Sequence, residues 1–248
     1  MATVSVIMPA YNAQSTIAES IESVLLQSFQ DFELLICDDS SSDGTLAIIK
    51  HYANVDERVK LVNNAYKKGA AGARNSCIEI SKSRFIAFLD SDDLWDSTKL
   101  YEQVNFMIKH DLSMSHGEYV MFNRNGNIKK VYPKRTIGYS DIIKKCDIGC
   151  LTVMLDCSKI ESVLFPDSPK EDYALWVVLM KAGYISKAYP GCHARYRKQE
   201  KSISSSKFKE ISKQYFVLKN FSGLRTISRF YCIFTYAFNG LLKHFFRR

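Results

Sequence analysis

Long apolar runs, glycine-rich phosphate loops and paired cysteines are all missing from this 248-residue sequence. The apolar stretch nearest the C-terminus, residues 230–242, is too short and too polar to span a bilayer. The seven cysteines show no CxxC spacing, which argues against a disulfide framework or a zinc site and fits a reducing cytoplasm. No leader typical of a signal peptide, internal repeat or low-complexity tract is seen. We therefore expect one globular domain, or one domain with a C-terminal extension.

The turn after the first expected strand contains no glycine. Residues 4–8 (VSVIM) form an apolar segment that stops at Pro9, and the turn continues with Ala10, Tyr11 and Asn12. A dinucleotide-binding loop or a Walker-type phosphate loop needs glycine here, so that phosphates can approach the backbone. Both types of nucleotide site are therefore set aside.

Strand-like segments alternate with helical patterns through the first 110 residues. We expect strands at residues 4–8, 32–37, 59–62 and 85–89, and helices at 16–27 with Ser15 as cap, around 46–52, at 69–80 and at 97–110. This alternation is typical of βαβ units around a parallel sheet, so the fold class is α/β. Further along, we expect strands at 114–122, 128–132 and 151–155 and a helix from 171 to 183.

An apolar strand at residues 85–89 runs directly into three carboxylates, Asp90, Asp92 and Asp93. In an α/β sheet the carboxyl ends of the strands form the crevice where ligands bind. Three like charges in four positions repel one another, and a divalent cation relieves that repulsion. Hard oxygen ligands favour Mg²⁺ or Mn²⁺, with coordination positions left for substrate phosphate. The alternative is an acidic loop in which Asp93 or Asp96 caps the next helix.

Two further acidic pairs fall where expected elements begin or end. Asp38 and Asp39 follow the second strand, while Glu171 and Asp172 open a strongly apolar helix. For Glu171 and Asp172, simple helix capping is one explanation. The functional alternative for Glu171 and Asp172 is a general base within hydrogen-bonding reach of a hydroxyl.

Five motifs occur in the order seen in family 2 glycosyltransferases: residues 4–12 (VSVIMPAYN), 38–45 (DDSSSDGT), 72–75 (GARN), 88–93 (FLDSDD) and 171–173 (EDY). Over about residues 3–200 the sequence resembles these inverting enzymes. The resemblance implies a GT-A fold at residues 1–200, with a mixed, mainly parallel sheet flanked by helices. A basic, aromatic-rich helical tail follows at 201–248.

The resemblance also implies roles for individual residues. Asp92 corresponds to the metal ligand, assisted by Asp90, with Mn²⁺ or Mg²⁺ as the cofactor. Asp172 corresponds to the catalytic base, with Glu171 beside it, and inversion converts an α-linked UDP-sugar into a β-glycoside. The residues that the resemblance implies for binding the nucleotide-sugar donor are Pro9, Ala10, Tyr11, Asn12, Asp39, Arg74, Asp90, Ser91, Asp93 and Arg197.

Some correspondences leave alternatives open. Residues 196–197 and 202–204 resemble a segment that closes over the donor diphosphate. His193 is either an extra metal ligand or a structural histidine. The QxxRW motif of processive cellulose and hyaluronan synthases is missing, which favours addition of a single sugar in O-antigen, capsule or exopolysaccharide synthesis.

The C-terminal tail is strongly basic. Residues 195–248 contain thirteen Lys or Arg and only two acidic residues, which gives this segment a net charge of +11. The net charge of the whole chain is +8. Apolar residues recur at helical spacing at 224, 227, 230, 231, 234, 237, 238, 241, 242 and 245. We expect an amphipathic helix that lies on the anionic cytoplasmic face of a bacterial inner membrane, near an acceptor carried on polyprenyl diphosphate. The alternative is a helix packed on the catalytic domain.

Two other functions would each account for part of this pattern. Nucleotidyl transfer also uses strand-end aspartates and a metal, but it usually needs a basic, glycine-rich loop after the first strand. Nucleic-acid binding would use the basic tail, yet it leaves the acidic clusters unexplained. We therefore expect a nucleotide-sugar donor and no nucleic-acid partner.

Overall fold

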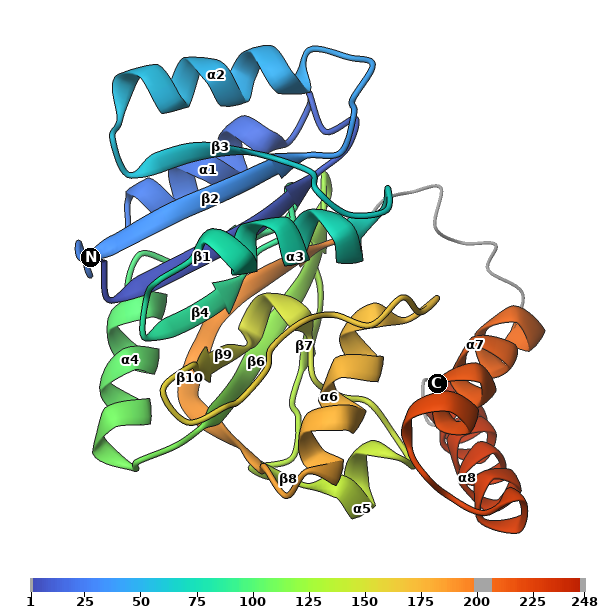
Figure 1. Cartoon of the computed structure of the whole chain (residues 1–248). Coiled ribbons are helices and arrows are strands. Elements are labelled where there is room, and N and C mark those ends of the chain that lie inside the picture. The colour runs from blue at the N-terminus through green and yellow to red at the C-terminus, as the bar shows by residue number, and fades with distance from the viewer. Residues whose placement is uncertain (1, 199–206, 246–248) are drawn as a thin grey trace.

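A computed structural model describes residues 2–198 and 207–245, and its centre is one twisted sheet (Figure 1). The strands follow the order β3-β2-β1-β4-β9-β6-β10-β5, with β7 paired to β6 and β8 paired to β10. Their bounds are β1 Val4–Ala10, β2 Phe32–Asp38, β3 Val59–Asn63, β4 Phe85–Phe88, β5 Leu94–Trp95, β6 Met114–Asn123, β7 Gly126–Val131, β8 Thr136–Ile137, β9 Met154–Asp156 and β10 Ser186–Arg197.

Most of the long strands run in one direction. The β1, β2, β3 and β4 strands pair in parallel. Because β9 is antiparallel to both β4 and β6, β6 runs parallel to β4, and β10 is parallel to β6. The carboxyl ends of β1, β2, β4, β6 and β10 therefore meet at one edge of the sheet. The mixed α/β fold expected from the sequence is confirmed.

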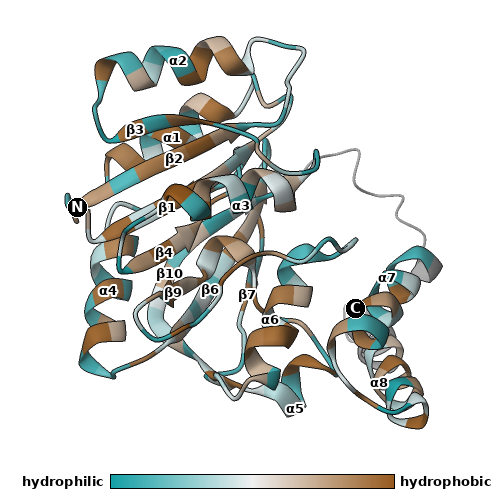
Figure 2. Ribbon diagram, in the orientation of Figure 1, coloured by the Kyte–Doolittle hydropathy of each residue, from teal (hydrophilic) through white to brown (hydrophobic). Residues whose placement is uncertain are grey.

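Helices cover both faces of the sheet. Val4, Val6 and Met8 of β1 pack toward α1, α2 and α4, while Ile7 packs toward α3 and α6. This alternation follows the two-residue period of a strand, and both faces are apolar because both are covered. Hydrophobic colour accordingly concentrates in the central strands (Figure 2). The helices are α1 Ile17–Leu25, α2 Thr45–Val55, α3 Ala70–Ile80, α4 Lys99–Lys109, α5 Tyr139–Ile142, the 3₁₀ helix η1 Cys150–Thr152, α6 Glu171–Lys181, α7 Lys207–Phe221 and α8 Thr226–Phe245.

Several boundaries differ from the sequence prediction. The strand expected at 151–155 begins only at Met154, because residues 150–152 form η1. Thr16, not Ser15, precedes α1, and no side chain caps that helix. The helix expected from 69 begins at Ala70, since Gly69 has a φ of 132°. Strand β10 was missed.

The C-terminal tail forms two helices, α7 and α8, which lie beside α6 and away from α2 (Figure 1). Val217, Leu218 and Cys232 are buried in the same cluster as Tyr173 and Trp176 of α6. The packed alternative is therefore correct for one side of the tail. Within the described residues, no helix is long and apolar enough to cross a membrane.

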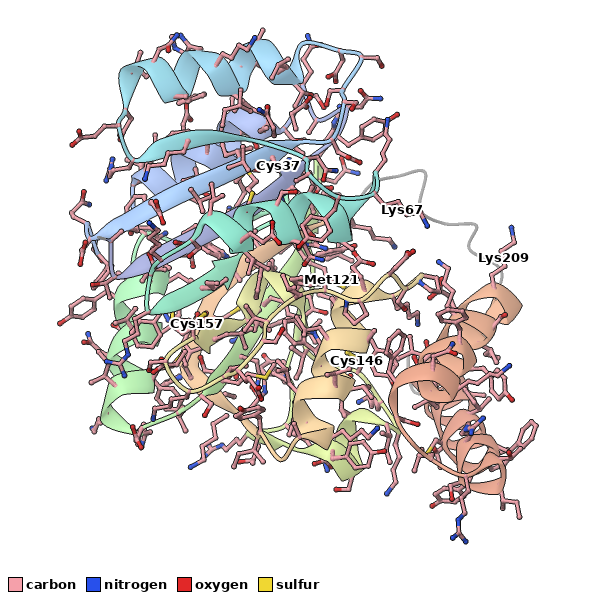
Figure 3. All side chains as sticks on the ribbon, viewed as in Figure 1. Cys37, Lys67, Met121, Cys146, Cys157 and Lys209 are labelled. Atoms are coloured by element: carbon pink, nitrogen blue, oxygen red, sulfur yellow. The ribbon has the colours of Figure 1, made fainter. Side chains whose placement is uncertain are left out.

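All seven cysteines are free. Cys37, Cys146 and Cys157 lie well apart in Figure 3; Cys37 belongs to β2, whereas Cys146 and Cys157 lie in loops. Cys37 is buried against α3, where its contact with Cys77 is part of the core, as its place in an apolar run predicts.

Candidate active site

A cleft of about 1030 Å³ opens at the edge where the parallel strands end. It is lined by residues from loops far apart in the sequence. The predicted site residues that line it are Pro9, Ala10, Tyr11, Asn12, Asp39, Arg74, Asp90, Ser91, Asp92, Glu171 and Arg197. Of the predicted set, Asp93 and Asp172 do not line the cleft.

Arg74 is the central cation of the cleft. It lies on α3 with only 4% of its surface exposed. Its Nη2 donates to Asp90 Oδ1 at 2.5 Å, its Nη1 donates to Glu171 Oε1 at 2.9 Å, and its guanidinium lies over the Phe165 ring. Burial alone would lower the pKa of Arg74, but the two carboxylates raise it well above the usual range. The Arg74 guanidinium therefore links the loop after β4 to the first turn of α6 through one ion pair to each.

One side of the cleft is built from the ends of β1 and β2. Asp39 is nearly buried, and its carboxylate accepts hydrogen bonds from Asn64 Nδ2 and the Gly69 backbone N–H, both at 2.7 Å. Asn12 has a φ of 47° and accepts a hydrogen bond from the Ser42 backbone N–H. The Lys68 ammonium lies over the face of the Tyr11 ring in a cation–π contact. The Asn12 contact holds the loop after β1 against the loop after β2, and the Asp39 and Tyr11 contacts hold these two loops against the segment that follows β3.

The acidic loop after β4 is fixed by Arg197 of β10. Its backbone N–H donates to Asp93 Oδ1 at 2.8 Å and its Nε donates to the Asp92 carbonyl at 2.7 Å. Asp93 is therefore buried behind the cleft, where burial and the charges of Asp90 and Asp92 raise its pKa. Neither Asp93 nor Asp96 caps α4, because Thr98 precedes that helix.

Asp172 lies in the first turn of α6, partly buried behind Glu171. Its Oδ1 accepts a hydrogen bond from the Tyr173 backbone N–H. Burial and the neighbouring Glu171 charge raise the pKa of Asp172. A carboxylate whose pKa is raised is a stronger base than an exposed aspartate, which suits proton removal from a hydroxyl. Cys146 lies beside α6 (Figure 3), and burial and the Asp172 charge raise its pKa to about 12.

The donor atoms present suit a hard divalent cation. Within the described residues, no three His, Cys, Asp or Glu side chains are grouped so as to hold a metal ion by themselves. Asp90 and Asp92, separated in the sequence by Ser91, nevertheless line the same cleft. A protein commonly binds Mg²⁺ or Mn²⁺ through one or two carboxylates, and the phosphate of the substrate completes the coordination. His193 does not line the cleft. Its Nδ1 lies 3.2 Å from Thr98 Oγ1 and its ring stacks on Tyr189, which favours the structural alternative.

Sequence reasoning missed several residues of the cleft. Glu19 of α1 pairs with Arg197 at 2.5 Å. Asn123 ends β6 and Arg124 begins the turn to β7, where the sequence predicts only a hairpin. Lys198 follows the unpredicted β10. The remaining lining residues are Ala13, Ser15, Thr16 and Ala70. Residues 202–204, compared above with a closing segment, lie outside the described residues.

A cleft lined by several carboxylates, at the carboxyl edge of a mixed α/β sheet, is the arrangement expected for a glycosyltransferase of the GT-A type. The chain belongs to glycosyl transferase family 2, whose sequence model matches residues 5–158. This assignment confirms the predicted family and enzyme class, and it favours sugar transfer over nucleotidyl transfer or nucleic-acid binding.

Full-length relatives are similar across almost the whole chain. An Escherichia coli protein named UDP-Glc:alpha-D-GlcNAc-diphosphoundecaprenol beta-1,3-glucosyltransferase WfgD is 44% identical, with 98% of this chain and 95% of the relative covered. The E. coli protein WfaP, whose name gives the same activity, is 41% identical over 99% and 97% of the two chains. The Bacillus subtilis protein TuaG, named a putative teichuronic acid biosynthesis glycosyltransferase, is 37% identical over 97% and 96%.

Solved structures share the fold at low sequence identity. S. aureus TarS 1-349 in complex with UDP-GlcNAc superposes with a TM-score of 0.70 at 21% identity, covering 96% of this chain and 72% of TarS. Pyrobaculum calidifontis PcManGT in complex with GDP-Man and Mn²⁺ gives a TM-score of 0.68 at 16% identity, covering 95% and 69%. Both likenesses support the GT-A architecture.

Proposed function

We propose that this enzyme transfers one glucose residue from UDP-glucose to GlcNAc carried on undecaprenyl diphosphate, with inversion to a β-linkage, during synthesis of a bacterial surface polysaccharide. The names of two nearly full-length E. coli relatives give this activity. The structural observation that carries the proposal is the cleft at the carboxyl edge of the sheet. It brings the ends of β1, β2 and β4 together with the first turn of α6.

The donor would lie across the ends of β2, β1 and β4. Asp39 accepts a hydrogen bond from the nucleobase, and the loop from Pro9 to Asn12 lies beside it. Both Asp39 oxygens already accept hydrogen bonds from the protein, so the carboxylate is held in place before the base arrives. Each carboxylate oxygen can accept a further bond.

The divalent cation would be held by Asp92, with Asp90 assisting. When bound, such a cation supplies positive charge that stabilises the departing diphosphate. Asp90 is oriented by Arg74, whose other nitrogen holds Glu171. Arg74 therefore positions the carboxylates instead of pairing with the donor directly.

The general base is assigned to Asp172, as the family resemblance implies, and its neighbour Glu171 is the residue of this pair that lines the cleft. The acceptor hydroxyl oxygen forms a bond to the anomeric carbon of glucose, the bond from that carbon to the diphosphate breaks, and the hydroxyl proton passes to Asp172. UDP leaves with the bonding electrons. Attack opposite the leaving group inverts the anomeric centre, so an α-linked donor gives a β-glycoside.

The tail helix α8 is proposed to lie on the anionic cytoplasmic face of the membrane that carries the acceptor. Ile227, Phe230, Tyr231 and Phe234 are 59% to 86% exposed and follow a spacing of three and four residues along the helix. Such spacing places them on one face. Arg225 and Arg229 supply positive charge near this face, as expected for an interfacial helix.

A transfer assay tests the proposed function. Purified enzyme is incubated with Mn²⁺, UDP-glucose and a synthetic α-GlcNAc-diphosphate carrying a lipid chain, and the product linkage is determined by NMR. We expect a β-linked disaccharide. Asp172→Asn should bind UDP normally in calorimetry but form no product, whereas Asp92→Asn should lose the Mn²⁺-dependent part of UDP binding. Normal transfer by both variants would contradict these roles.

A further inference from the structure

Two tyrosines from neighbouring strands lie side by side near the carboxyl edge of the sheet. Tyr119 belongs to β6 and Tyr196 to β10, and their ring centroids are 6.3 Å apart with an interplanar angle of 65°, an edge-to-face contact. The parallel ladder pairs Ala194 with Tyr119 and Tyr196 with Met121. Because side chains alternate along a strand, this register places the two tyrosines on the same side of the sheet. We refer to Tyr119 and Tyr196 as the tyrosine pair.

Tyr196 and Arg197 are consecutive residues of β10, and consecutive side chains of a strand point to opposite sides. Arg197 lines the cleft and pairs with Glu19 of α1. Tyr196 does not line the cleft. The donor diphosphate that family resemblance associates with residues 196–197 therefore suits Arg197, whereas Tyr196 lies on the other side of the strand.

The tyrosine pair lies near the proposed base. Burial raises the pKa of the Tyr196 hydroxyl, and the charges of the acidic loop after β4 and of Asp172 raise it further. Burial also raises the pKa of Tyr119 to about 12, with a contribution from Cys146, whose own pKa is raised by burial and by Asp172. Since electrostatic effects weaken with distance, these groups lie close together. Tyr196 and Asp172 are thus neighbours, and neither of them lines the cleft.

One ring of the pair is held in place and the other is open to solvent. Tyr119 is partly buried and packs against Gly149, where an added Cβ would lie 3.0 Å from the Tyr119 ring. Tyr196 is 40% exposed. Tyr119 therefore supports an aromatic ring that remains available to a ligand.

An aromatic ring beside the base suits the acceptor sugar. The acceptor hydroxyl must come within hydrogen-bonding reach of Asp172 while the donor occupies the cleft. One face of a pyranose presents C–H groups that pack on an aromatic ring, and its hydroxyls remain at the rim. We propose that the exposed ring of Tyr196, supported by Tyr119, is the surface on which the acceptor sugar stacks. This inference rests on the proposed function, which assigns the base to Asp172 and a pyranose to the acceptor.

Steady-state kinetics separate the acceptor from the donor. We expect Tyr196→Ala to raise KM for GlcNAc on a lipid diphosphate about tenfold, the scale of one aromatic contact, while KM for UDP-glucose changes less than about twofold. Tyr196→Phe keeps the ring and should retain both constants. Tyr101→Ala is the control, because it removes a tyrosine that is 52% exposed on α4, and it should change neither constant. A rise in KM for UDP-glucose in place of the acceptor would assign Tyr196 to the donor and overturn the proposal, and so would equal losses in Tyr196→Phe and Tyr196→Ala.

A binding measurement without donor separates this proposal from the proposed function. Saturation-transfer NMR with α-GlcNAc-diphosphate on a short, water-soluble lipid chain reports which protons of the acceptor contact the protein. We expect the C–H protons of the GlcNAc ring to be saturated in the wild type and in Tyr196→Phe, and much less in Tyr196→Ala. This result would support the stacking surface even if UDP-glucose were not the donor. Equal saturation in the wild type and Tyr196→Ala would overturn the proposal even if the wild type transferred glucose normally.

Discussion

Arg74 Nη1 donates a hydrogen bond to Glu171 Oε1 at 2.9 Å, across 97 positions of sequence. The same guanidinium holds Asp90, so the acidic loop after β4 and the first turn of α6 share one buried cation. Neither carboxylate is deeply buried, but the arginine is. The relative positions of the proposed metal ligands and the proposed base therefore depend on a residue with no proposed part in the chemistry.

Replacing Arg74 with Met should affect both stability and catalysis. Loss of the cation leaves Asp90 and Glu171 facing each other across the cleft, and removal of one partner from a buried pair typically costs about 3 to 5 kcal/mol. We expect a loss toward the lower end of that range, because both carboxylates are partly solvated, together with a fall in kcat of more than tenfold. Urea unfolding and the transfer assay measure the two effects.

Arg58→Met is the matched control. Arg58 pairs with Asp56 at 2.7 Å, but both side chains are 22% to 25% exposed and lie away from the cleft. A pair of this type contributes about 1 kcal/mol or less. If both variants lost the same stability and kept full activity, Arg74 would have no special role in joining the two loops.

Much of this cleft was predictable because strand direction fixes where a strand ends. Asp39, Asp90 and Asp92 each follow an apolar strand, and once those strands are parallel their ends must meet at one edge. Arg74 and Glu171 were identified by family resemblance, while their mutual contact was not. A contact between α3 and α6 depends on how both helices pack on the sheet, which no local pattern records.

Strand β10 shows what local patterns could not reveal. It contains Pro190 and Gly191, and its pairing with β6 is interrupted by two register shifts. Those interruptions remove the regular alternation by which a strand is recognised. Because β10 was missed, Lys198 had no predicted location. Arg124 was overlooked for a different reason: the turn signal at Asn125 and Gly126 predicts a hairpin and says nothing of what lies opposite it.

The activity of the enzyme should depend on pH through Asp172. Burial and Glu171 raise the pKa of Asp172, and the base must be ionised, so kcat/KM should increase as pH rises through that pKa. Glu171→Gln removes the neighbouring negative charge. The acidic limb of the pH profile should then move to lower pH, while Glu57→Gln, an exposed control, should leave it in place.

The same raised pKa has a consequence for stability. A carboxyl whose pKa is higher in the folded than in the unfolded state stabilises the fold at low pH, and that contribution is lost as pH rises through the folded pKa. Asp172→Asn has no such titration. Its free energy of unfolding, relative to wild type, should therefore increase with pH over this range. A constant difference across the range would contradict the raised pKa.

The exposed face of α8 should control membrane binding without affecting chemistry. We expect Ile227→Gln with Phe234→Gln to reduce flotation on anionic vesicles at least fivefold, because both side chains are largely exposed and lose apolar area on substitution. Transfer to a water-soluble acceptor should be unchanged. Leu26→Gln, which removes an exposed leucine at the end of α1, should float like wild type.

Two results would count against a lipid surface. Equal flotation of the double variant and the wild type would show that this face does not insert. A change from dimer to monomer in the double variant, measured by ultracentrifugation without vesicles, would assign the face to a second copy of the chain. Truncation near Gly223 is a less informative test, because it also removes Cys232, which is buried against the catalytic core.

Lys170 links the tail to the helix that carries the proposed base. Its Nζ lies 3.2 Å from Glu210 Oε2 on α7 and 3.4 Å from the Tyr236 hydroxyl on α8, and the residue immediately precedes α6. Lys170→Met should therefore lower stability by about 1 to 2 kcal/mol and lower kcat, because Glu171 and Asp172 lose a support on one side. Binding of UDP, measured by calorimetry, should be unchanged.

Lys213→Met provides a closely matched comparison, since Lys213 pairs with the same Glu210 at 2.9 Å but both residues lie on α7. It should cost less than 1 kcal/mol, as an exposed pair within one helix does, and leave kcat unchanged. Lys170→Arg should restore most of the lost activity by keeping the charge. If Lys170→Met and Lys213→Met gave the same kcat, the tail would be only a structural appendage, and the first turn of α6 would be held by Arg74 alone.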